Sequence, residues 1–221
     1  SAKKMWDKGG IPVGHVKANQ TTAQMISDGA GGAIIFWQDE RNTLSYKDLY
    51  AQRISAQGAV LWGEGGMLVC GENGDQSDIC AISDGAAGAY VAWTDFRRGE
   101  RNPDIFAQLL DKNGQPLWQK DGVAVCGAPD IQRSPRLIRD QEGGVLVVWT
   151  DKGGGSYDIY GQKVNRQGQA LWIRDGIPIN QLSRTQQNAL LLNSGIVVWE
   201  DYRFGHWDIF ANAVSPQGKL L

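Results

Sequence analysis

Tryptophan recurs at a nearly constant interval along the 221 residues of this chain. One set precedes stretches rich in Gly with Val, Ile or Pro, and a second set ends apolar runs; the two sets are Trp6, Trp62, Trp118 and Trp172, and Trp37, Trp93, Trp149 and Trp199. The repeat length of roughly fifty residues is typical of one blade of a β-propeller. Four copies predict one domain, residues 1–221, because a single unit cannot bury its own apolar faces.

Each unit contains the same order of predicted strands. An inner strand is followed by a tight turn with Asp-Gly in the first two units, which is a strong hairpin signal. The second strand is almost wholly apolar, as in AIIFW and VLVVW, which indicates burial on both faces. A third strand and a short fourth strand, typified by residues 59–62, complete the unit. The predicted inner strands are 20–27, 76–83, 132–139 and 185–192, and the third strands are 48–54, 104–110, 158–164 and 208–214.

These strands predict an all-β fold, a single four-bladed β-propeller of four-stranded antiparallel blades. Residues 218–221 match residues 58–61, so the next Trp of the pattern would be residue 222, and Met5-Trp6 supplies it. We therefore expect the N- and C-terminal segments to meet in one blade and close the ring, which leaves only short, protected sheet edges. Residues 1–6 alone are an alternative source of the closing strand.

The run GGAIIFWQDER, followed by DLYAQRISAQGAVLW, and its later copies resemble a β-propeller repeat common in secreted and surface-attached bacterial proteins. The resemblance covers essentially all 221 residues. It implies the propeller fold and a location outside the cell or in the cell envelope, but no catalytic or ligand residue. We separately expect the domain to belong to a larger multidomain surface protein. The third unit departs from it with Gly153 where Arg41, Arg97 and Arg203 stand, and the fourth has a shortened turn at 193–195.

Composition excludes two classes of partner. A net charge of −2 with interspersed acids and bases gives no basic patch for nucleic acid. The longest apolar runs span about five residues, far fewer than the roughly twenty that a membrane helix needs. Three cysteines, Cys70, Cys80 and Cys126, leave two alternatives open: buried free thiols, or a Cys70–Cys80 disulfide.

Features that occur in every unit are interpreted as scaffold. This applies to the second tryptophan set and to two recurring carboxylates per unit, which we expect to tie the loop between the second and third strands. The carboxylates are Asp39, Asp95, Asp151 and Asp201, and Asp48, Asp104, Asp158 and Asp208. The third unit lacks the Arg, so Asp151 and Asp158 are the pair most free for another role. They are weak candidates for a calcium site, because calcium favours clustered oxygen ligands.

The loops between the second and third strands differ most between units and carry the candidate binding residues. Tyr46, Tyr157 and Trp207 place aromatic rings there, which suits sugar faces or partner anchors. Arg136 belongs to a predicted inner row, Gln24, Cys80, Arg136 and Ala189, and is a candidate for holding an anion in the channel.

The function expected from these features is a non-catalytic interaction module that binds a protein partner or a cell-surface component through one ring face. We expect no enzyme activity, since no single-copy catalytic constellation is visible, and no cofactor beyond a channel or loop ion. The alternatives are a glycan-binding propeller and, less favoured, a glycoside hydrolase, because glycosidases do use paired carboxylates.

Overall fold

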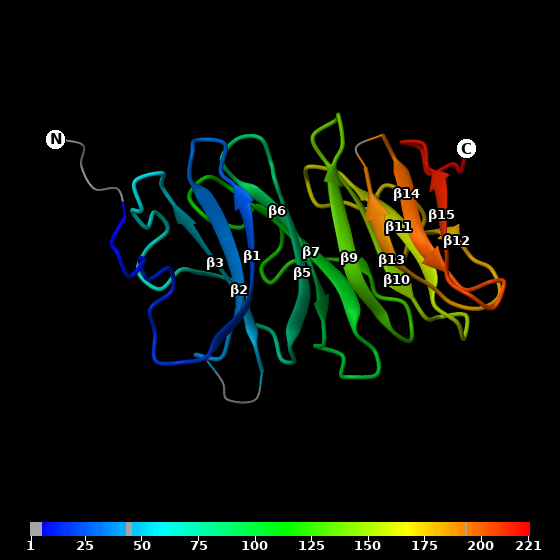
Figure 1. The fold of residues 1–221 in the computed structure, drawn as a ribbon, viewed down its shortest axis with the longest axis horizontal. Helices are drawn as coiled ribbons and strands as arrows, with labels where there is room; N and C mark the ends of the chain where they lie inside the picture. The colour runs from blue at the N-terminus through cyan, green and yellow to red at the C-terminus, as the bar shows by residue number, and fades with distance from the viewer. Residues whose placement is uncertain (1–5, 43–45, 193) are drawn as a thin grey trace.

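A computed structural model describes residues 6–42, 46–192 and 194–221. Across these ranges the chain forms fifteen β-strands and no helix, which confirms the all-β class. The strands make four antiparallel sheets that stand side by side in a row (Figure 1). Neighbouring strands of each sheet are also neighbours in sequence, so every sheet is a simple meander.

The strand bounds repeat from sheet to sheet. The first sheet contains β1 (Gln20–Ser27), β2 (Ala33–Asp39), β3 (Asp48–Ile54) and β4 (Met67–Cys70). The second contains β5 (Gln76–Ser83), β6 (Ala89–Asp95), β7 (Asp104–Leu110) and β8 (Val123–Cys126). The third contains β9 (Gln132–Arg139), β10 (Val145–Asp151), β11 (Asp158–Val164) and β12 (Ile177–Asn180). The fourth contains β13 (Gln186–Leu191), β14 (Ile196–Asp201) and β15 (Asp208–Ala213).

The outermost strand differs from the predicted one. Residues 59–62 contribute only a single bridge, between Val60 and Ile54, and the fourth strand of the sheet is β4, in the stretch that follows Trp62. The same holds in the second and third sheets, where β8 and β12 lie at the outer edge. Pro178 in β12 fits this position, because an edge strand tolerates a residue that cannot donate a backbone hydrogen bond.

The core lies between successive sheets. Trp93 packs with Ile34, Phe36 and Leu49 of the preceding sheet, and all four side chains are buried. Trp149 and Trp199 take the equivalent places at the next two interfaces. Each sheet therefore covers its predecessor, and burial on both faces explains why the second strands are continuous apolar runs.

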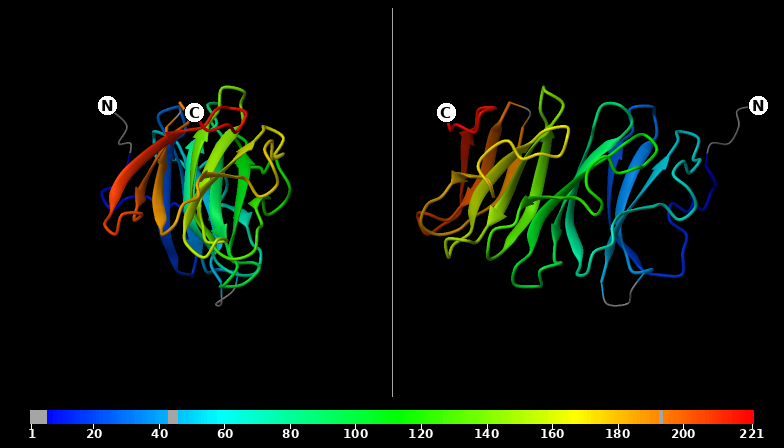
Figure 2. Two further views of the ribbon diagram at one scale, coloured as in Figure 1. Left: turned by 90° about the vertical axis from the view of Figure 1, so that its right-hand side faces the viewer. Right: turned by 180° about the vertical axis from the view of Figure 1, so that it is seen from behind.

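The closed ring is not confirmed. The two ends of the described chain lie at opposite ends of the row, near the N and C labels of Figure 1 and of the right-hand view of Figure 2. The faces of the end sheets are uncovered accordingly: Met25 is 69% exposed and Ile209 is 72% exposed, whereas Leu49 and Ile159, equivalent to Ile209, are fully buried. Met5, part of the predicted closure, lies outside the described residues.

The inner strand of the fourth sheet also differs by one residue. It begins at Gln186, the buried equivalent of Gln132, and not at Thr185. Leu190 pairs with Val198 as Arg136 pairs with Val148, so Leu190 and not Ala189 completes the predicted inner row. A one-residue slip moves a side chain to the other face of a strand, which explains why Ala189 is buried and Leu190 is exposed.

The sheets share two edges, which we name for their connections. The turn rim carries the tight turns, including 28–32, 84–88, 140–144 and 215–218, and lies along the upper side of Figure 1. The loop rim carries the loops that follow β2, β6, β10 and β14, including 96–103, 152–157 and 202–207, and lies along the lower side. None of the described residues forms a helix of the length and apolarity needed to cross a bilayer.

Candidate functional site

The recurring carboxylates of the loop rim anchor their loops. The indole N–H of Trp93 donates to Asp95 Oδ2 at 2.7 Å, and the Arg97 guanidinium pairs with the same oxygen at 2.7 Å. The backbone N–H of Arg97 donates to Asp95 Oδ1. The same contacts occur around Asp39 and Asp201. The oxygens of these carboxylates are occupied by hydrogen bonds and ion pairs that hold the loops, so these residues are not candidates for catalysis.

The third sheet keeps the carboxylate and lacks the cation. Asp151 accepts from Trp149 at 3.2 Å and from the Gly153 N–H at 2.8 Å, but forms no salt bridge among the described residues. Asp158 is its direct partner across the ladder of β10 and β11. Burial raises the pKa of Asp158 to about 6 and also raises that of Asp151. Over the described ranges, no three His, Cys, Asp or Glu side chains cluster so as to hold a metal ion.

The predicted aromatic residues lie on separate loops of the loop rim. Tyr46 is 40% exposed, Tyr157 is half-buried below Lys152, and Trp207 packs on Tyr202 with ring centroids 5.0 Å apart. They are contributed by the first, third and fourth sheets and line none of the described pockets.

The remaining candidates lie inside the sheets. Arg136 donates to the carbonyl of its neighbour Pro135 at 2.9 Å. All three cysteines are free thiols, with Cys70 and Cys126 buried, and burial raises the pKa of Cys126 to about 12. Such thiols are held in the unreactive protonated form.

A pocket that sequence reasoning missed opens on the turn rim, between the third and fourth sheets. Its origin is a shortened hairpin. Gln24 and Phe36, the first pair after the bulge in β1, enclose eleven residues, whereas the equivalent pair Leu190 and Val198 encloses seven. The hairpin of β13 and β14 therefore contains four residues fewer than the equivalent hairpins and does not cover the interface.

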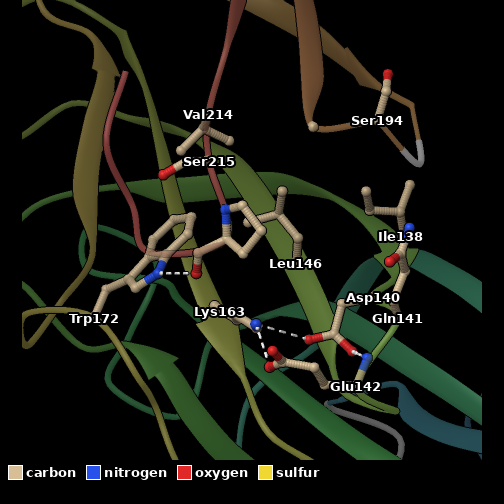
Figure 3. Close-up of a pocket in the computed structure, with 12 residues that line it drawn as sticks. Ile138, Asp140, Gln141, Glu142, Leu146, Lys163, Trp172, Ser194, Val214 and Ser215 are labelled. Carbon is tan, nitrogen blue, oxygen red and sulfur yellow. Dashed lines mark hydrogen bonds and ion pairs between the residues drawn. The ribbon is translucent and has the colours of Figure 1, made fainter. Parts of the chain in front are cut away.

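The pocket has a volume of about 260 Å³ and combines an apolar floor with a charged wall (Figure 3). The floor is formed by Ile138, Leu146 and Val214, and the half-buried indole of Trp172 forms one side. Its indole N–H donates to the Pro216 carbonyl at 3.2 Å, which holds the ring in place. An aromatic face beside polar groups is a frequent arrangement in ligand pockets.

The charged wall consists of two carboxylates on one ammonium. Lys163 Nζ lies 2.7 Å from Glu142 Oε2 and 3.2 Å from Asp140 Oδ2. Burial disfavours the charge on Lys163, but its contacts with Glu142 and Asp140 outweigh this and raise its pKa. Asp140 Oδ1 accepts from the backbone N–H groups of Glu142 and Gly144, while its buried Oδ2 faces the Lys163 ammonium.

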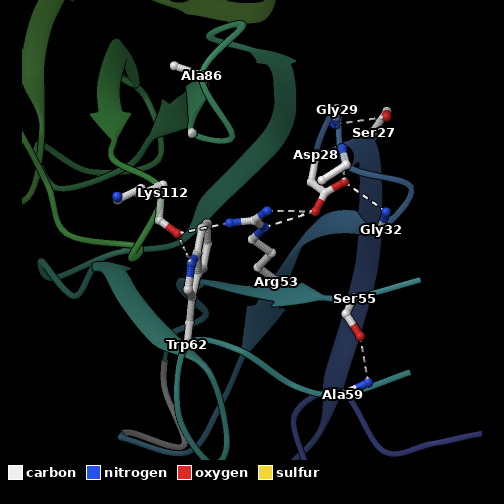
Figure 4. Close-up of polar contacts among 12 residues, drawn as sticks. Ser27, Asp28, Gly29, Gly32, Arg53, Ser55, Ala59, Trp62, Ala86 and Lys112 are labelled. Atoms are coloured by element: carbon white, nitrogen blue, oxygen red, sulfur yellow. Dashed lines mark hydrogen bonds and ion pairs between the residues drawn. The ribbon is translucent and has the colours of Figure 1, made fainter. Parts of the chain in front are cut away.

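The same place between the first and second sheets is filled (Figure 4). Arg53 pairs with Asp28 at 2.9 Å and also donates to the Lys112 carbonyl of the next sheet at 3.3 Å. The Trp62 indole donates to that same carbonyl at 2.9 Å and is only 4% exposed. Lys163, at the position of Arg53, instead contacts the carboxylates of its own sheet.

Two sequence signals point to this pocket. The turn at 193–195 is short, and Glu142 is a single-copy acid at a turn position where the first two units have Ala30 and Ala86. A residue that differs from its repeat partners is a candidate for a role that occurs once, and Glu142 meets this criterion in the sequence alone.

No protein-family model and no curated protein matches the chain. Solved structures do match. The Hadza microbial sialidase Hz136 aligns with a TM-score of 0.55 and 12% identity over 90% of this chain and 45% of its own. An endo-1,5-α-L-arabinanase from Thermotoga petrophila gives 0.53 and 13% over 91% and 58%. Zg3597, a family 117 glycoside hydrolase from Zobellia galactanivorans, gives 0.52 and 9% over 92% and 73%. The chain therefore has a β-propeller fold.

These matches overturn the expectation of a non-catalytic interaction module without enzyme activity. That expectation was based on the lack of a visible single-copy catalytic constellation, whereas the matching structures include an arabinanase and glycoside hydrolases. The expectation is contradicted on this ground. At 9–13% identity the likeness establishes the fold and leaves activity to be argued from the site.

Proposed function

We propose that this propeller is a glycoside hydrolase that binds a sugar in the pocket between the third and fourth sheets. The observation that carries the proposal is the pairing of Asp140 and Glu142 on Lys163 beside the half-buried Trp172. Paired carboxylates about 5–5.5 Å apart perform retaining glycoside hydrolysis, and two carboxylates that contact one ammonium lie close together. The propeller fold shared with glycoside hydrolases supports the same class.

The two carboxylates have different surroundings and so suit different roles. Asp140 is held in place by two backbone N–H groups and by Lys163, which suits a fixed nucleophile or stabilising carboxylate. The Glu142 side chain is 73% exposed at the pocket mouth, where it can exchange protons with solvent and with a bound sugar. Trp172 offers a face for a sugar ring, and the volume of about 260 Å³ accommodates a single ring better than a chain. We propose that the reaction takes place outside the cell or at its surface.

The proposal is tested with a panel of arabino-, xylo- and sialo-oligosaccharides, with released reducing sugar as the measurement. Glu142→Gln keeps the shape of the side chain but abolishes its ability to transfer a proton. Turnover is therefore expected to fall roughly 10²–10⁴-fold while sugar binding persists. Glu100→Gln, an exposed substitution on the loop rim, is the matched control and is expected to leave turnover unchanged. If the unaltered protein binds a sugar without cleaving it, glycan binding replaces hydrolysis as the function. If it neither binds nor cleaves any sugar of the panel, the proposal is refuted.

A further inference from the structure

Three of the four sheets hold a guanidinium in the same place on the loop rim. Arg97 Nη2 lies 2.7 Å from Asp95 Oδ2 and donates to the Asp121 carbonyl at 2.9 Å. Its Cζ lies 3.7 Å from the centre of the Phe106 ring. All three sites combine a carboxylate with an aromatic face, and those of Arg41 and Arg97 add a backbone carbonyl. The guanidinium-to-ring distances of the sister sites are 3.9 Å for Arg41 over Tyr50 and 3.8 Å for Arg203 over Phe210.

The third sheet keeps the partners of that guanidinium. Tyr160 stands at the position of Phe106 and stacks on Trp149 at 6.3 Å, the same separation as Phe106 from Trp93. Asp175 stands at the position of Asp121 with the same left-handed backbone, φ 62° against 60°. The loops after β10 and β6 also begin with the same hydrogen bond. The Gly153 N–H donates to Asp151 at 2.8 Å, and the Arg97 N–H donates to Asp95 at 2.9 Å.

Two buried carboxylates are consequently left without a cation. Asp151 and Asp158 are 5% and 3% exposed and form no salt bridge among the described residues. Asp158 Oδ1 is buried without a hydrogen-bond partner. The electrostatics of equivalent carboxylates differ accordingly. Desolvation opposes the charge on the buried Asp39, but hydrogen bonds from Arg41, Gln20 and Trp37 together outweigh it and lower its pKa to about 2, whereas desolvation raises the pKa of the equivalent Asp151.

Both carboxylates face an exposed loop without side chains. A Cβ at Gly153 would lie 3.0 Å from Asp151 Oδ1, and one at Gly154 would lie 3.4 Å from Asp158 Oδ2. Gly155 has nothing within 4 Å of an added Cβ. The three glycines are exposed, so a ligand can approach the carboxylates over bare backbone.

We propose that the third sheet binds an external guanidinium group, such as that of an arginine, at the position which Arg41, Arg97 and Arg203 occupy in its sister sheets. A planar guanidinium can contact the Asp151 carboxylate with parallel N–H groups while its face rests on Tyr160. Asp158 supplies the second negative charge. A lysine-like ammonium lacks the flat face and the fork of donors, so it is the weaker ligand.

Isothermal titration with methylguanidinium tests the site directly, with methylammonium and calcium as comparison ligands. The unaltered protein is expected to bind one methylguanidinium per chain and to bind methylammonium at least about tenfold more weakly, equal to about 1.4 kcal/mol. An arginine-containing peptide and free arginine then distinguish a protein partner from a small molecule. No saturable heat with methylguanidinium, or heat with calcium alone, would overturn the proposal.

Gly153→Arg provides the sharpest variant, because it restores the side chain of the sister sheets at a residue without a positive φ. This variant is expected to stop binding and to unfold at higher temperature than the unaltered protein. Arg97→Gly is the reciprocal change, expected to raise the stoichiometry from one to two. If Arg97→Gly fails to fold, Asp151→Asn serves as the second test and is expected to abolish binding. Undiminished binding by Gly153→Arg would overturn the assignment.

Discussion

The first and last interfaces of the row are built from the same repeat and end in opposite states. Between the first and second sheets, Arg53 and Trp62 both reach the Lys112 carbonyl and close the turn rim. Between the third and fourth sheets, Lys163 contacts only carboxylates of its own sheet among the described residues, and Trp172 remains half-buried beside a pocket. A hairpin four residues shorter thus accompanies the change from a sealed interface to an open pocket.

This difference teaches where to look for function in a repeat protein. Residues at the same repeat position have the same structural role wherever their neighbours are also the same. The backbone N–H groups of Trp62 and Trp172 donate the same hydrogen bond, to the side-chain oxygens of Gln52 and Gln162 respectively, yet Trp172 lines the turn-rim pocket whereas Trp62 is buried. The neighbour that changed, and not the tryptophan, determines the role of the ring.

The largest expected effect breaks the sealed interface. Trp62→Ala should lower the free energy of unfolding by about 3–5 kcal/mol, because a buried large aromatic is lost. Trp172→Ala should cost only about 1–2 kcal/mol, since its ring is already half-exposed. Urea titration measures both, and urea avoids the guanidinium ligand proposed above. Equal losses for the two variants would contradict the contrast between the interfaces.

The next effect concerns the two cations at the equivalent positions Arg53 and Lys163. Arg53→Met leaves Asp28, whose side chain is 2% exposed, without its partner and should cost about 3 kcal/mol. Lys163→Met should cost about 1 kcal/mol, because the Glu142 side chain is 73% exposed and regains water. A larger loss for Lys163→Met would reverse the comparison.

The pH dependence of Arg53→Met is a further check on the first interface. Burial opposes the charge on Asp28, but hydrogen bonds from Ala30, Arg53 and Gly32 outweigh it and lower its pKa. The stability that ionised Asp28 contributes is therefore present above the ordinary Asp pKa and is lost as pH falls through the lowered value. The cost of Arg53→Met should shrink on acidification across that range, as urea titrations at successive pH values would show.

The smallest expected effect concerns the loop rim, where the first and third sheets are expected to differ in how their carboxylates affect stability. Asp48 accepts a hydrogen bond from Asn42 at 2.7 Å, whereas the equivalent Asp158 has a buried oxygen without a partner. Because the folded pKa of Asp158 is raised to about 6, stability should fall as pH rises from its unfolded value to about 6. Asp158→Asn should remove that fall and gain about 1–2 kcal/mol above pH 6. Asp208→Asn, at the same repeat position but partly exposed, is the control and should change little.

The repeat period and alternation made the strands predictable. Six strands have the bounds predicted from the sequence: β1, β3, β5, β7, β9 and β11. Strong local signals mark several of these bounds, such as the Asp that opens β3, β7 and β11. The outer strands were missed because MLVC and VAVC follow Gly-rich turns and resemble linkers in isolation. Their pairing depends on β3 and β7 being in place, which is a tertiary effect that local patterns do not contain.

The candidate site was less predictable than the fold. Glu142 and the short turn at 193–195 are visible in the sequence, but their meeting depends on how two hairpins reach over one interface. The missing Arg at Gly153 was visible and pointed correctly to Asp151 and Asp158 as unlike their sisters. What the sequence did not show is that the ring and carbonyl of the guanidinium site remain in place.

The open row also determines how cooperative this molecule is. Each sheet buries its faces only against its immediate neighbours, so the fourth sheet, with three described strands and one covered face, has the fewest supports. Amide hydrogens of β13–β15 should exchange before those of β6 and β10. A ligand lodged beside that sheet would slow its exchange, and thereby report occupancy of the pocket as protection of the C-terminal end.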